Sequence, residues 1–129
     1  MDKVNLAQKL AQFSDYWSPK IVGEINDFAL KVVKVQGEFV WHHHDQEDEL
    51  FLVVKGRLGM QVREPDAAER TIWIEEGEFI VIPHGIEHCP ITEIETHILL
   101  LEPKTTINTG NVQSDRTVPY EQQQEVAGD

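Results

Sequence analysis

The chain has 129 residues, of which 40% are hydrophobic and 26% are charged, a composition typical of one soluble globular domain with a single core. Eleven Lys and Arg against 23 Asp and Glu give a formal charge of −12, which disfavours nucleic acid and anionic membrane surfaces as partners. Cys89 is the only cysteine, so an intramolecular disulfide and a Cys-rich zinc site are both excluded. Since neither a secretory signal nor a membrane-spanning apolar stretch is visible, we expect a cytoplasmic protein.

The first predicted element is a short amphipathic helix over about residues 5–13. Leu6, Leu10 and Phe13 recur at helical spacing, and Asn5 can cap the first turn. We expect this helix to cover an opening or an edge of the domain.

From Ile21 onward, short β-branched or aromatic runs alternate with Gly, Pro, Asn and Asp. The predicted strands are residues 21–24, 28–36, 39–44, 49–55, 57–63, 70–74, 78–82 and 97–102. Many short strands without intervening helices favour an all-β antiparallel sandwich or barrel. We expect residues 1–129 to form one domain, with its core at about 20–103. The tail, residues 104–129, is expected to pack outside the barrel or to be partly disordered, and its final Gln-rich stretch to be poorly ordered.

Three consecutive histidines lie in the predicted strand at residues 39–44. Side chains two apart on a strand share a face, so His42 and His44 point the same way and His43 points to the other face. Glu49 opens the next predicted strand and can place its carboxylate beside the pair of imidazoles. Imidazole and carboxylate groups are common ligands of divalent transition metals.

A second motif lies far along the chain, where Gly77 is followed by Pro83, Gly85 and His88. The Pro-x-Gly corner ends one strand sharply and starts another. This geometry can turn His88 inward, beside the first three candidate ligands.

The two motifs together resemble those of the cupin superfamily. Residues 37–56, GEFVWHHHDQEDELFLVVKG, resemble the first cupin motif, and residues 77–92 resemble the second, Gly-x5-Pro-x-Gly-x2-His. The chain looks like a small single-domain cupin. The resemblance implies a double-stranded β-helix, or jelly-roll barrel, with a metal ion in its mouth held by His42, His44, Glu49 and His88. It also favours a homodimer, which would cover the second apolar face of the strand at residues 49–55.

The ligand set leaves coordination positions open for a small molecule or O₂ and suits Fe, Mn, Ni, Co, Cu or Zn. A metal-dependent enzyme on a small molecule, of dioxygenase, isomerase or lyase type, is the first hypothesis, with Glu49 as a catalytic base. The alternative is a non-catalytic, metal-bearing module that binds or senses a small ligand. Its expected feature is a narrow, wholly apolar pocket with no acid or base beyond the metal ligands.

Several other side chains have open roles. Glu47 and Asp48 are alternative ligands that fit the spacing less well than Glu49. His43 is expected to be exposed or at an interface, His84 can reach the pocket rim, and His97 can face inward as a donor to a ligand. Cys89 is expected to be a buried small residue. The following side chains could line a ligand pocket or belong to the core: Trp41, Phe51, Met60, Trp73 and Phe79.

Overall fold

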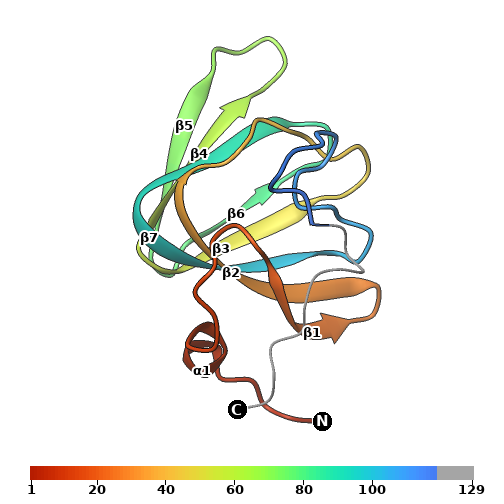
Figure 1. The fold of residues 1–129 in the computed structure, drawn as a ribbon. Helices are drawn as coiled ribbons and strands as arrows, with labels where there is room; N and C mark the ends of the chain where they lie inside the picture. Colours follow the sequence, from red (N-terminus) through yellow and green to blue (C-terminus); the bar gives the residue numbers. More distant parts are fainter. Residues whose placement is uncertain (119–129) are drawn as a thin grey trace.

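Antiparallel strands form nearly all of the regular structure in the computed structural model, which describes residues 1–118 (Figure 1). The strands are β1 (Lys20–Ile25), β2 (Phe28–Glu38), β3 (Glu49–Lys55), β4 (Arg57–Arg63), β5 (Arg70–Glu75), β6 (Phe79–Ile82) and β7 (Glu87–Pro103). One short helix, α1 (Leu6–Leu10), precedes them. The predicted all-β class is therefore confirmed. In residues 1–118, no helix has the length and apolar character needed to cross a membrane.

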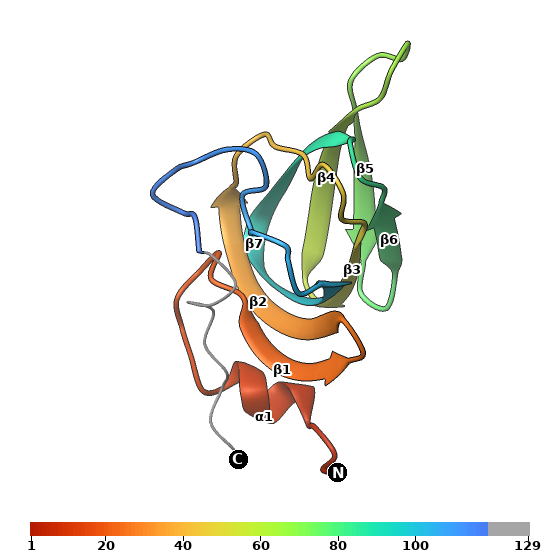
Figure 2. The ribbon, with the colours of Figure 1, turned by 90° about the vertical axis from the view of Figure 1, so that its right-hand side faces the viewer.

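The long strand β7 joins the two halves of the barrel. Its first half, up to Ile91, pairs with β4, and its second half, from Thr96, pairs with β2 and β3. The order β1-β2-β7-β3-β6 forms one wall, while β4 and β5 form the other (Figure 2). The sequence predicted only residues 97–102 of this strand, because the exposed Glu93, Ile94 and Glu95 interrupt the apolar pattern at its bend.

The core lies between the two walls and is formed by side chains two apart on each strand. Val33 and Val35 come from β2, and Phe51 and Val53 come from β3. The opposite wall contributes Leu58, Met60, Val62 and Ile74, all at most 3% exposed. This alternation leaves the neighbouring side chains of β3 on the outer surface of the barrel.

Two further predicted elements differ clearly from the structure, the helix and the strand at 39–44. The helix ends at Leu10 rather than near residue 13, although Asn5 caps it as predicted, accepting a 3.0 Å hydrogen bond from the Gln8 amide. Phe13 leaves the helix and lies beside the amines of Lys20 and Lys34. The predicted strand at 39–44 is wrong.

The segment at 39–44 forms no strand because Gly37, with φ of 87°, lies at the irregular end of β2 and the chain then crosses the barrel mouth. Only His42 pairs with another strand there. Its amide donates to the His88 carbonyl at 3.0 Å and its carbonyl accepts from the His88 amide at 2.8 Å. Two further backbone bonds, from the Phe39 amide to the Pro90 carbonyl at 3.0 Å and from the Gly85 amide to the His44 carbonyl at 2.7 Å, help this bridge to tie the segment to the second predicted motif.

The chain beyond β7 turns back over the segment that follows β2 (Figure 1). The Asn111 amide donates to the His43 carbonyl at 3.0 Å, and its side chain accepts from the His43 amide at 2.8 Å. Thr106 and Thr109 are fully buried in this turn. The Gln-rich end, expected to be poorly ordered, lies outside the described residues.

Candidate metal centre

Four predicted ligands lie together inside the barrel mouth. His42 and His44 come from the segment between β2 and β3, Glu49 from the first position of β3, and His88 from β7. Each is between 1% and 4% exposed. One ligand atom from each residue lies within 4.8 Å of all the others, so the group could hold a metal ion. His88 thus meets three residues that lie 39 or more positions before it in the sequence.

Backbone carbonyls orient two of the imidazoles. The Nδ1 atom of His42 lies 2.9 Å from the Val40 carbonyl oxygen, and that of His88 lies 2.8 Å from the Ile86 carbonyl oxygen. Because a carbonyl only accepts, Nδ1 carries the proton in each neutral ring and donates it. The Nε2 atoms therefore carry the lone pairs, which is the arrangement found in metal-binding histidines.

Glu49 stands between the other two imidazoles. Its Oε1 atom lies 2.8 Å from Nε2 of His44 and 3.3 Å from Nε2 of His88. Neither approach has the direction of a hydrogen bond, so these three buried atoms are left without a hydrogen-bond partner. Buried polar atoms are seldom left unsatisfied in native proteins. A cation at the centre of the group would satisfy all three, so the residues fit a metal ion.

Two of the four residues have shifted pKa values, and both shifts favour the state that binds a metal ion. Desolvation, followed by the nearby His88, lowers the pKa of His42 to about 4. The imidazole is therefore neutral at pH 7. Burial alone would raise the pKa of Glu49, but contacts with Glu102, His44 and His88 outweigh it and hold that pKa well below its usual range.

Glu102, which the sequence did not point out, lies against Glu49. The two carboxyl groups are close enough to influence each other's pKa, and the Oε1 atom of Glu102 accepts from the Lys31 amine at 2.6 Å. Burial and the Glu49 charge raise the pKa of Glu102 well above its usual range, against the opposing effect of Lys31. We therefore assign the proton of the carboxyl pair to Glu102 and the negative charge to Glu49, with the Lys31 amine balancing that charge.

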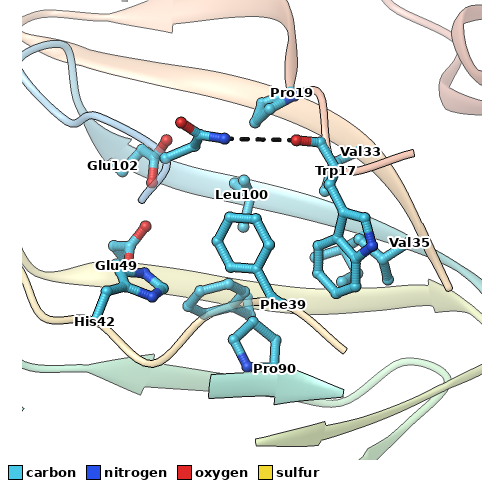
Figure 3. A pocket seen from close by; sticks show the side chains of 13 residues that line it. Trp17, Pro19, Val33, Val35, Phe39, His42, Glu49, Pro90, Leu100 and Glu102 are labelled. Atoms are coloured by element: carbon cyan, nitrogen blue, oxygen red, sulfur yellow. Dashed lines mark hydrogen bonds between the residues drawn. The ribbon is translucent and has the colours of Figure 1, made fainter. Parts of the chain in front are cut away.

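A pocket opens directly onto His42, Glu49 and Glu102 (Figure 3). It holds about 460 Å³ of space, counting the part that is open to solvent. The apolar part of its lining is formed by Trp17, Pro19, Val33, Val35, Phe39, Phe51, Pro90, Ile98 and Leu100. Asn108 also lines the pocket, and its amide donates to the Trp17 carbonyl at 3.5 Å. A mainly apolar lining with a few polar groups at one end is typical of a small-molecule site (Figure 3).

The other candidate histidines stay outside the cluster. His43 lies between Glu87 and Asp45, at 3.1 and 2.9 Å, on the side expected from strand alternation. His84 is exposed and contacts Asp48 at 2.9 Å. His97 contacts Glu95 on the outside of the barrel and does not line the pocket.

The remaining candidates divide between core and surface. Phe51 lines the pocket, and Met60 is fully buried in the core. Trp41 and Trp73 stack instead on Arg63 and Arg57. Phe79 is 61% exposed, and Cys89 is buried as expected. The Glu47 carboxylate accepts a hydrogen bond from the Thr105 hydroxyl outside the cluster.

A signal for Lys31 and Glu102 was present in the sequence. Lys31 shares the inward phase of β2 with Val33 and Val35, and Glu102 shares that of β7 with Ile98 and Leu100. A lone charge on the apolar face of a strand indicates a buried partner. Sequence alone did not show that the two strands pair.

The chain belongs to the cupin family, since the Cupin domain family matches residues 29–102. It is 30% identical to the uncharacterized protein YdbB of Bacillus subtilis over 83 residues, which cover 64% of this chain and 70% of YdbB. A crystal structure of a cupin-2 domain containing protein from Shewanella frigidimarina is 41% identical, with a TM-score of 0.72. That match covers 78% of this chain and 93% of the other.

Enzymes with this fold are also among the similar structures. The hydroquinone 1,2-dioxygenase PnpCD, in complex with Cd²⁺ and 4-hydroxybenzonitrile, has a TM-score of 0.62 and 16% identity. The match covers 74% of this chain and 69% of the dioxygenase. At this identity the likeness shows a shared fold alone.

Proposed function

We propose that this protein is a metal-dependent enzyme acting on a small molecule, with one divalent transition metal ion held by His42, His44, Glu49 and His88. The observation that carries the proposal is the buried group of donor atoms within 4.8 Å of one another, three of them without a hydrogen-bond partner. Three imidazoles and one carboxylate suit Fe, Mn, Ni, Co, Cu or Zn, and they leave coordination positions open.

A bound ion would supply Lewis-acid or redox chemistry to an oxygen atom of the ligand, as in dioxygenases, isomerases and lyases. A protein with the same fold, hydroquinone 1,2-dioxygenase PnpCD, is in complex with Cd²⁺, which supports metal binding by a protein of this fold. The chain itself supplies the pocket, which places the ligand beside His42 and Glu49.

Glu49 is the proposed proton acceptor of the reaction. It lines the pocket and carries the negative charge of the carboxyl pair, while Glu102 beside it holds a proton. Glu102 is an acid in addition to the four proposed ligands. A module that only binds or senses a ligand was expected to have no such group, so this residue favours the enzyme over the binding module.

The proposed setting of the enzyme is the cytoplasm, with a small molecule as its ligand and neither nucleic acid nor membrane as a partner. The net charge of −12 supports the proposed absence of nucleic acid and membrane partners, since it repels phosphate-rich surfaces. A homodimer is proposed as the assembly.

Metal content tests the proposal. Untagged protein purified without chelator is analysed by mass spectrometry, together with His42→Ala, His88→Ala and the control His84→Ala, whose exposed imidazole lies outside the cluster. We expect about one ion per chain in the parent and the control, and at least a tenfold lower content in the other two variants. Iron would direct the next assay to O₂ consumption, and the other metals to isomerase and lyase reactions. A parent that holds no metal and takes up none on incubation would contradict the proposal.

A further inference from the structure

The pocket beside the metal cluster has two chemically different ends (Figure 3). At one end lie His42, Glu49 and Glu102, and the rest of the wall is apolar apart from Asn108. Phe39 separates the two ends. Its ring stacks on Trp17 with centroids 4.8 Å apart and meets the His42 ring edge to face at 5.5 Å. A ligand that fills the pocket must therefore be polar only at the end that reaches the cluster.

The side chains of the pocket disfavour an anionic group at its apolar end. No Lys or Arg lines the pocket in the described part of the chain. The Lys31 amine is bonded to Glu102, and Arg116 lies over the Trp17 ring rather than in the wall. A carboxylate or phosphate at the apolar end would therefore be buried with no cation of the chain to offset its charge.

The hydrogen-bond groups at the pocket disfavour a sugar or another polyol. The Asn108 amide nitrogen donates to the Arg116 carbonyl at 2.6 Å, and its oxygen accepts from the Val118 amide at 2.6 Å. The apolar end then offers no polar side chain for the ligand. Each hydroxyl buried there without a partner would lower the affinity by about tenfold or more.

We infer that the ligand is a mostly apolar small molecule whose polar, oxygen-bearing group is at one end, which lies beside His42, Glu49 and Glu102. The body of the molecule packs against Phe39, Val35 and Leu100. This inference rests on the proposed function, because it takes the pocket beside the metal cluster as the ligand site.

Two probes separate the ligand classes: phenol for an apolar molecule with one oxygen group, and glucose for a polyol. Their binding to the protein as purified is measured by ligand-observed NMR and calorimetry. We expect phenol to bind at least tenfold more tightly than glucose. Phe39→Ala should weaken phenol binding about tenfold, since it removes an aromatic wall. Phe39→Leu, which keeps most of the side-chain volume, should fold even if the alanine variant does not and should weaken binding by a smaller factor.

Trp73→Ala is the matched control, because Trp73 stacks on Arg57 outside the pocket and its loss should leave phenol binding unchanged. Tighter binding of glucose than of phenol, equal effects of the Phe39 and Trp73 variants, or no phenol binding would overturn the inference. Metal content is measured on the same samples. If the ligand tests fail while the protein contains metal, the inference about the ligand is wrong and the proposed metal centre is unaffected. If phenol binding depends on Phe39 but the protein takes up no metal, only the proposed metal centre is contradicted.

Discussion

Lys31 and Glu102 are ionisable side chains on strands where the neighbouring inward residues are apolar. Neither is more than 1% exposed, and their 2.6 Å contact lies behind Glu49, the proposed metal ligand. Removing the Lys31 cation is costly, because the Glu49 charge then stays without compensation and away from water. Lys31 thus links the stability of the barrel to the charge of the proposed metal site.

Lys31→Met is expected to lower the free energy of unfolding of the metal-free protein by about 3 kcal/mol, since the Glu49 charge loses its buried cation. Urea unfolding in the presence of chelator measures the change. The double variant Lys31→Met with Glu49→Gln should be less destabilised than the single variant, because the charge left without a cation by the first change is removed. A loss below about 1 kcal/mol in the single variant would show that Lys31 does not carry this role.

At the scale of elements, the segment after β7 is held against the loop between β2 and β3. The contact is close at Gly110, where φ is 55° and an added Cβ would overlap the carbonyl oxygen of His43 and approach Cδ2 of His42 to 3.0 Å. Only a residue without a Cβ fits this approach. The segment therefore helps to hold the loop that carries His42 and His44.

Gly110→Ala is expected to displace the segment and to lower the free energy of unfolding by about 1–3 kcal/mol, with faster proteolytic cleavage after residue 103. Gly77→Ala is the control, because its φ of 81° is also positive but no atom lies within 4 Å of the added Cβ. The free energy of unfolding of the control should fall only by the cost of placing alanine at a positive φ, about 1 kcal/mol. Equal losses and equal cleavage rates in the two variants would show that packing on His43 does not matter.

At the scale of the whole molecule, one wall of the barrel has an apolar outer face. Leu50 is paired with Val81 on one side and Leu101 on the other, and Leu52 is paired with Phe79 and Leu99, so these six side chains share that face. Phe79 and Val81 are 61% and 47% exposed. The helix α1 packs near Val54 at one end of the face. An apolar surface of this kind suits a second copy of the chain.

A dimer is therefore expected, with a mass by light scattering of twice 14.8 kDa at micromolar concentration. Phe79→Asp combined with Val81→Asp should shift the protein to a monomer, since it places charges on the proposed contact. Ile94→Asp, at an equally exposed apolar position in the bend of β7, should leave the dimer intact. A monomeric parent protein would contradict the dimer.

Much of the fold was predictable because strand formation depends on local alternation and turn residues. The predicted strands at 49–55 and 57–63 coincide with β3 and β4, and four others differ by one or two residues at either end. The segment at 39–44 was not predictable, since its apolar residues have the pattern of a strand but cross the barrel mouth. Its pairing at His42 depends on a strand 46 residues away.

The sequence alone determined that His42, His44, Glu49 and His88 form one candidate site, because two spaced motifs carry residue types with a common metal chemistry. Tertiary structure alone decided what surrounds that site. Glu102 and Lys31 meet only because β2 and β7 pair, and Trp17 and Asn108 reach the pocket only because both ends of the barrel sequence fold back to its mouth. Candidate metal-binding residues can be recognised from their spacing within short motifs. The walls of a pocket come from long-range packing that no local pattern encodes.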